Sequence, residues 1–199
     1  MYIKESAIAA VALVAVIPLV GFAVNYVVTG ILQTLFSLIS RSGGLYLFFA
    51  NRLTFAGVIW HELSHALFAF LTGAKVEEIS LYHKEGNHLG YVKFRPRGIW
   101  PAQCVQLSLS ACAPVIMGIL ALFGIHAALR SLSLPVWGVV IAVYLFVSIL
   151  VHMDMSPEDL KSYIKGVPFF LIVFFVLALV YISGHPEALT TVKGWFMRS

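Results

Sequence analysis

The stretch "GVIWHELSHALFAFLTG", residues 57–73, places three titratable side chains inside an otherwise apolar run. The longer run around it, Gly44 to Leu71, is long enough to cross the hydrocarbon core of a bilayer, which takes about 20 helical residues. The whole chain of 199 residues is 60% hydrophobic and 11% charged, whereas a soluble domain is about half apolar and about one quarter charged. The composition therefore predicts that this stretch, and most of the chain, lies in lipid.

Five apolar runs have lengths that suit membrane helices. They predict an all-α polytopic membrane protein, built as a single membrane-embedded domain over residues 1–199. The fourth and fifth runs are short, so a tilted helix or a half-span remains an alternative for each. The predicted spans cover about residues 7–28, 44–72, 104–129, 134–151 and 167–183.

The longest polar stretch, "KVEEISLYHKEGNHLGYVKFRPR" at residues 75–97, has the pattern of a β-hairpin. Two partly alternating segments with β-branched and aromatic residues flank "KEGNH", whose Gly86 and Asn87 suit a turn. A two-stranded hairpin alone is marginal in water. We therefore expect a small membrane-associated β-hairpin, at about residues 76–95, that packs on the helices or lies in the membrane interface.

The basic residues predict the orientation of the chain. With five spans, the N-terminus and the segments 73–103 and 152–166 share one side of the membrane, and this side has more Lys and Arg than the other. The positive-inside bias predicts that this side faces the cytoplasm, and that the protein is a multi-pass protein of the cell (plasma) membrane. The net charge of +4 is spread over loops and mixed with acids, so we predict no nucleic-acid binding. The basic residues of the predicted cytoplasmic side are Lys4, Lys75, Lys84, Lys93, Arg95, Arg97, Lys161 and Lys165.

The segment "HELSH" has the spacing of a zinc site. On a helix, His61 and His65 lie on one face, about one turn apart, so both imidazoles can bind one metal ion. Glu62, beside the first histidine, can reach a water on that metal without being a ligand. This is the H-E-x-x-H arrangement of metalloproteases. Zinc lowers the pKa of its water to about 7, and the glutamate accepts the proton.

A purely structural role is the alternative for these three residues, as helix caps or as a polar interface between spans. A charged group at bilayer depth costs at least about 2.5–3.5 kcal/mol and is functional by default. The depth of the motif therefore favours a metal site.

A second polar segment, "HMDMSPEDLKSYIKGVP" at residues 152–168, predicts the start of a helix. Ser156 suits the N-cap, Pro157 the first helical position, and the two acids that follow suit the first turn. Pro168 is expected to kink or end the first part of this helix.

The sequence "HELSHALFAFLTGAKVEEISL" resembles the site-2 proteases, a family of intramembrane zinc metalloproteases. "SLSACAPVIMG" resembles the small-residue–Pro motif of a following helix through Ala113 and Pro114, but it lacks the family's Gly before the Pro and Asn after it. The resemblance covers about Thr54 to Gly166. Hydrolysis needs water at a depth where lipid excludes it, so we expect the site to face a polar cavity between spans two, three and four that opens to the cytoplasmic side.

The resemblance also implies a third zinc ligand, an aspartate in a Pro-containing segment late in the core. Asp159 follows a proline, opens a helix and comes after the fourth span, as that aspartate does, although the family's Leu-Asp-Gly is absent here. Asp154 and Glu158 remain alternatives, as does plain helix capping by Asp159. His152 could hydrogen-bond a ligating carboxylate. The predicted site is thus one Zn²⁺ per chain on His61, His65 and Asp159, with Glu62 as the catalytic base.

The resemblance implies an intramembrane endopeptidase that cuts membrane proteins within or near a transmembrane segment. An exposed edge of the hairpin, around Tyr91 to Phe94, could hold an extended substrate by β-augmentation. One alternative is a non-catalytic zinc-binding relative that binds or chaperones membrane helices, although the intact Glu62 argues against it. Another is a metal transporter or sensor, which would need ligands on several spans. The expected partners are the lipid bilayer and a membrane-protein substrate, and the sequence carries no signal for an oligomeric state.

Overall fold

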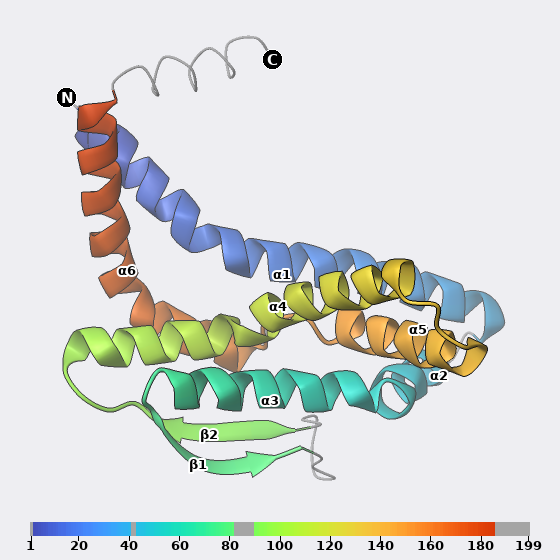
Figure 1. Cartoon of the computed structure of the whole chain (residues 1–199). Coiled ribbons are helices and arrows are strands. Elements are labelled where there is room, and N and C mark those ends of the chain that lie inside the picture. Colours follow the sequence, from blue (N-terminus) through green and yellow to red (C-terminus); the bar gives the residue numbers. More distant parts are fainter. Residues whose placement is uncertain (1, 41–42, 82–89, 186–199) are drawn as a thin grey trace.

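The computed structural model describes residues 2–40, 43–81 and 90–185 as a bundle of helices with a small two-stranded sheet on one side (Figure 1). This confirms the predicted fold class, a polytopic helical membrane protein with a β-hairpin. The elements are α1 (Ile3–Ile39), α2 (Gly44–Phe48), the π-helix η1 (Phe49–Leu53), α3 (Phe55–Leu71), β1 (Lys75–Ser80), β2 (Tyr91–Arg95), α4 (Trp100–Ser131), α5 (Val136–Val151) and α6 (Pro157–Gly184).

Three helices, α1, α4 and α6, are long and apolar enough to cross a membrane, and α3 and α5 are shorter apolar helices. At about 1.5 Å per residue, the 17 residues of α3 and the 16 of α5 fall short of a hydrocarbon core of about 30 Å. The first helix extends to Ile39, well past the predicted end at residue 28.

The predicted second span, residues 44–72, is divided into three pieces. A short α2 leads into η1, and Thr54 separates η1 from α3. The buried hydroxyl of Thr54 donates to the carbonyl of Ala50 at 2.8 Å. The irregular turn therefore keeps its polar groups bonded inside the protein, as lipid requires, and α3 begins at Phe55.

Glycines let α3 and α4 come close to their neighbours. A Cβ atom on Gly57 of α3 would overlap the carbonyl of Ser148 in α5. One on Gly166 of α6 would overlap the carbonyl of Cys104 in α4. Small residues at such crossings bring helix backbones together in membranes, and here they bring α5 against α3 and α6 against α4.

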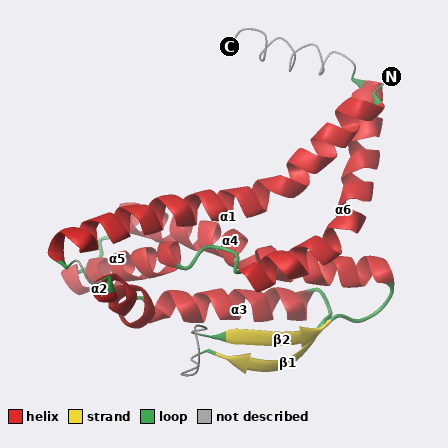
Figure 2. Cartoon of the chain, turned by 180° about the vertical axis from the view of Figure 1, so that it is seen from behind, coloured by secondary structure: helices red, strands yellow, loops and turns green. Residues whose placement is uncertain are grey.

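The hairpin runs back along α3, as Figures 1 and 2 both show. Gly73, with φ of 86°, turns the chain from α3 into β1. The strands are antiparallel, with Ser80 opposite Tyr91 and Lys75 opposite Arg95. The predicted turn residues, Gly86 and Asn87, lie outside the described residues. Because β2 lies beside the helix that carries "HELSH", the hairpin can form a wall of the site.

The helix α6 begins where the sequence predicts, at Pro157. Ser156 caps α6, whose first residue is Pro157, and a single helix continues through the predicted fifth span. Pro168 lies inside this helix rather than at its end, and Figure 1 shows α6 bending along its length. The bend carries the first turn of α6 towards α3 and α4.

Candidate metal centre

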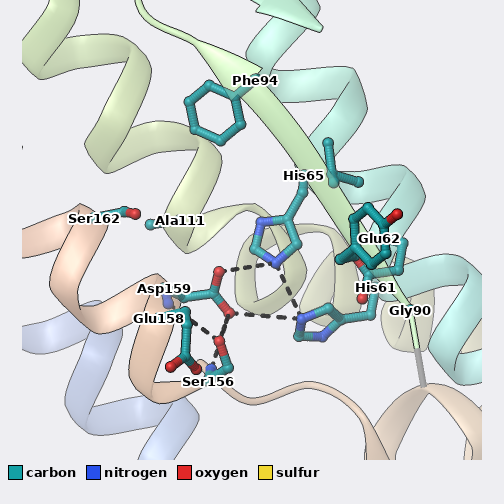
Figure 3. A pocket seen from close by; sticks show the side chains of 12 residues that line it. His61, Glu62, His65, Gly90, Phe94, Ala111, Ser156, Glu158, Asp159 and Ser162 are labelled. Atoms are coloured by element: carbon teal, nitrogen blue, oxygen red, sulfur yellow. Dashed lines mark hydrogen bonds and ion pairs between the residues drawn. The ribbon is translucent and has the colours of Figure 1, made fainter. Parts of the chain in front are cut away.

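His61 and His65 lie on one face of α3, as their spacing predicts. Their Nε2 atoms are 3.0 Å apart and their rings meet edge to face. Figure 3 shows both rings turned towards Asp159. The side chain of His65 is buried, and that of His61 is 13% exposed.

Backbone carbonyls fix the orientation of both rings. The Nδ1 atom of His61 lies 2.8 Å from the carbonyl oxygen of His152, and that of His65 lies 2.7 Å from the carbonyl oxygen of Ser110. A carbonyl oxygen only accepts, so each Nδ1 carries the proton and each Nε2 keeps its lone pair. Ligating histidines are held in this way in metal proteins. Two lone pairs 3.0 Å apart repel each other unless a cation or a proton lies between them.

The sequence explains why these two carbonyls are available. In a helix, the carbonyl of Ser110 would accept from the N–H of residue 114, but that residue is Pro114, which has none and lies inside α4. His152 follows the last residue of α5, where carbonyls have no helical partner. Both acceptors therefore come from breaks in regular hydrogen bonding.

Asp159 reaches the histidines from the first turn of α6. Its Oδ1 lies 3.2 Å from Nε2 of His65, and its Oδ2 lies 3.7 Å from Nε2 of His61. Oδ2 also accepts from the backbone N–H of Ser156 at 2.9 Å and from its hydroxyl at 2.7 Å. Asp159 thus completes the capping box of α6 and faces the histidines at the same time, so its capping role does not compete with a ligand role.

The three side chains fit a zinc ion by both chemistry and spacing. The ligand atoms of His61, His65 and Asp159 lie within 4.8 Å of one another. Two ligands at about 2.0–2.1 Å from a tetrahedral zinc are roughly 3.3 Å apart, and the three distances here are 3.0, 3.2 and 3.7 Å. Two imidazoles and one carboxylate are a donor set that leaves the fourth position open, as in catalytic zinc sites.

The other carboxylates that follow the motif lie elsewhere or have other partners. Asp154 accepts from Asn25 of α1 at 2.9 Å, and Glu158 pairs with Lys161 at 3.6 Å. On the hairpin, Glu77 pairs with Arg95 and Glu78 with Lys93. Glu85 and Glu187 lie outside the described residues. Among the described residues, one cluster of three or more His, Cys, Asp or Glu side chains could hold a metal ion, and it consists of His61, His65 and Asp159.

A cavity of about 470 Å³ opens onto this cluster. The need for water at the site predicts a cavity between spans two, three and four, but α5, the predicted fourth span, contributes no lining residue. Instead, β2 and the first turns of α6 complete the walls formed by α3 and α4. The lining residues are His61, Glu62, His65, Gly90, Tyr91, Val92, Phe94, Ala111, Ser156, Glu158, Asp159 and Ser162.

Glu62 lies beneath the start of β2. It is 8% exposed and lines the same cavity as the two histidines. A Cβ atom on Gly90 would lie 2.8 Å from Cγ of Glu62 and 2.9 Å from the carbonyl oxygen of Ser80. The absence of a side chain at residue 90 therefore allows the strand to pass close over the glutamate.

Three contributions to the site were missed or misplaced by sequence reasoning. A bond from the ring of His152 to a ligating carboxylate is one possibility that the sequence offers, but its Nδ1 lies 3.0 Å from the Ser148 carbonyl, and the backbone carbonyl of His152 contacts His61 instead. Ser110 was missed, although a proline four residues later is a usable signal for a free carbonyl. Gly90 was also missed, and its role depends on a tertiary contact that no local pattern shows.

Comparison with known proteins gives a family. The family model described as Peptidase M50B-like matches residues 6–197. No curated protein and no solved structure matches the chain. The matched region covers all of α3 to α6 and therefore every residue of the cluster.

Proposed function

Because the chain belongs to the Peptidase M50B-like family, we propose that it is an intramembrane zinc endopeptidase. It would hydrolyse peptide bonds within or near transmembrane segments of membrane proteins. Membership of the family supports a membrane peptidase of the site-2 protease type. The apolar helices support a location in the lipid bilayer. We further propose the plasma membrane as its location, with the N-terminus and the site on the cytoplasmic side, from the loop charges.

One observation carries the proposal. Two imidazoles, each with Nδ1 bonded to a backbone carbonyl, meet a carboxylate fixed by a capping box. The buried Glu62 lines the same cavity. A polar interface between helices would not need two Nε2 lone pairs 3.0 Å apart, whereas a metal ion requires lone pairs that converge in this way.

Each residue then has a defined task. His61, His65 and Asp159 would hold one Zn²⁺ per chain, and a bound zinc ion supplies Lewis-acid activation of water and of a peptide carbonyl. Glu62 accepts the proton of the attacking water and returns it to the leaving amine, which is general base and then general acid catalysis. The carbonyls of His152 and Ser110 keep both imidazoles in the tautomer that presents Nε2.

The substrate would be a membrane protein with a transmembrane segment, held in extended form. Tyr91, Val92 and Phe94 of β2 line the cavity, and in the described sheet β2 pairs on one edge only, with β1. The other edge offers backbone groups to an unwound segment. Replacing residues 91–94 by a scrambled order tests this, because unchanged cleavage of a known substrate contradicts a pairing role.

Zinc content per chain tests the metal site first. Elemental mass spectrometry of the purified protein should give about one zinc per chain. At saturating zinc, His61→Ala and Asp159→Ala should still lose it, whereas Asp154→Ala should bind about one zinc per chain, because Asp154 is not a ligand. Wild-type protein that is folded and purified without chelators but contains no zinc would overturn the proposal.

Glu62→Gln separates the protease from a helix-binding relative. The variant should keep zinc but lose cleavage of quenched-fluorescent peptides with transmembrane sequences, by at least about 100-fold, because general base catalysis contributes about 10²–10⁴-fold. Wild-type protein that binds zinc and these peptides without cutting any of them would instead support the non-catalytic reading.

A further inference from the structure

Asn25 is a polar residue in the long apolar helix α1. Its side-chain amide donates to Oδ2 of Asp154 at 2.9 Å, across 129 residues of sequence. The hydroxyl of Thr29, one turn later, lies 3.4 Å from the amide oxygen of Asn25. Polar side chains inside membrane helices are costly and mark contacts that matter, so the target of this hydrogen bond is informative.

Asp154 is the middle residue of the segment 152–156, whose two ends contact the metal cluster. At one end, the carbonyl of His152 accepts from Nδ1 of His61. At the other end, Ser156 donates twice to Asp159. Two of the three ligands therefore depend on this five-residue connection between α5 and α6, and a hydrogen bond from α1 holds its centre.

Packing on both sides also fixes the segment. Met153 is buried, and its side chain fills the space that a Cβ atom on Gly118 of α4 would occupy. From α1, a Cβ atom on Gly21 would lie 3.9 Å from the carbonyl oxygen of Met153. The connection thus lies between α1 and α4, and Asn25, one helical turn after Gly21, supplies the polar contact from α1.

We propose that Asn25 is a positioning residue for the metal centre. It holds the segment 152–156 so that the carbonyl of His152 and the cap at Ser156 keep His61 and Asp159 in ligating geometry. This inference rests on the zinc site of the proposed function, but it concerns a residue that contacts no ligand. Loss of a group that hydrogen-bonds a ligand directly weakens metal binding by about 10–100-fold, and Asn25 acts through two such groups, the carbonyl of His152 and the cap at Ser156.

Asn25→Leu is the direct test, because leucine is close in size, suits a lipid-facing helix and removes only the amide. The zinc dissociation constant of the detergent-purified full chain is measured by competition with a chromophoric chelator. We expect it to rise by about 10–100-fold. The visible absorption of the Co²⁺-substituted protein should lose the intensity of a tetrahedral site.

The exchanged pair Asn25→Asp with Asp154→Asn is the rescue. It keeps the net charge and rebuilds the hydrogen bond with donor and acceptor reversed, so zinc affinity should return to within about threefold of wild type, as expected for coupled partners.

Asn51→Leu is the matched control. Asn51 is exposed in η1, and the same substitution there should leave zinc affinity unchanged.

The outcomes are distinct. If the wild type binds zinc and Asn25→Leu binds it equally tightly, Asn25 positions nothing while the proposed function stands. If the wild type binds no zinc, both the proposed function and this inference fail. If Asn25→Leu does not fold, the exchanged pair decides, since weak zinc binding by a folded exchanged pair contradicts the inference. A metal-free melting temperature near that of the wild type shows that Asn25→Leu acts on the site and not on the whole fold.

Discussion

At the scale of single residues, Pro114 acts through the hydrogen bond that it cannot form. It leaves the carbonyl of Ser110 free to accept from Nδ1 of His65. Pro114→Ala supplies an N–H at position 114, which competes for that carbonyl and releases the ring. We expect zinc affinity to fall by about tenfold, at the lower end of the range for outer contacts, as measured by chelator competition.

Pro18→Ala is the control for this prediction, because it repeats the chemistry away from the metal. Pro18 lies inside α1, and the carbonyl four residues before it, that of Val14, accepts from the hydroxyl of Tyr163. The substitution should disturb the contact between α1 and α6 but leave the Ser110 carbonyl bonded to His65, so zinc affinity should fall clearly less than in Pro114→Ala. Equal losses of zinc affinity for both variants would show that the prolines act through general helix geometry.

Residue-scale reasoning from the sequence worked where the signal is local. The i, i+4 spacing of His61 and His65 fixes a common helix face, and Ser156 with Asp159 is a recognisable cap. The choice of Asp159 over Asp154 remains a prediction. The sequence could not reveal the partner of Asp154, because that partner is Asn25, 129 residues earlier.

At the scale of elements, the site depends on how closely α5 approaches α3. Gly57 lies one helical turn before His61 on the same face, and a Cβ atom there would overlap the Ser148 carbonyl and lie 2.7 Å from Nδ1 of His152. Gly57→Ala should therefore push α5 away. Overpacking of this kind costs about 1–3 kcal/mol, which should lower the melting temperature in detergent and weaken zinc binding.

Gly124→Ala is the matched control, because in the part of the chain that the structure describes, a Cβ atom at that position in α4 would meet no atom within 4 Å beyond its own stretch of helix. Alanine is the better helix former by about 1 kcal/mol, so this variant should melt at the same temperature or slightly higher. A Gly57→Ala protein with unchanged melting temperature and zinc affinity would mean that α5 moves without consequence for the site.

Element boundaries were harder to predict than element types. Hydropathy found the five apolar helices, because burial in lipid requires continuous apolar runs. It did not find the π-helical turn that divides residues 44–72, because Asn51 and Arg52 are only two polar residues within a long apolar stretch. That break depends on the fold of the backbone around Thr54, which periodicity does not show.

At the scale of the whole molecule, one buried side chain fixes the hairpin over the cavity. The amide of Gln106 in α4 donates to the carbonyls of Thr72 and Arg97 at 3.1 Å each and accepts from the N–H of Arg97 at 2.7 Å. Thr72 follows α3 just before β1, and Arg97 follows β2. Both ends of the hairpin are thus tied to the helix that also supplies the Ser110 carbonyl.

Gln106→Leu should release the hairpin while leaving the metal centre intact. It removes three part-buried hydrogen bonds, each with a net contribution of about 0.5–1.5 kcal/mol. We expect amide hydrogen exchange in residues 91–95 to accelerate by at least about tenfold, because exchange reports local opening, with zinc affinity unchanged. Gln103→Leu, which loses a single bond to the carbonyl of Gly98, should leave exchange in β2 near the wild-type rate. If Gln106→Leu weakens zinc binding as strongly as it accelerates hydrogen exchange in β2, the hairpin and the metal centre form one cooperative unit. In that case β2, which lines the cavity, cannot move independently of the ligands.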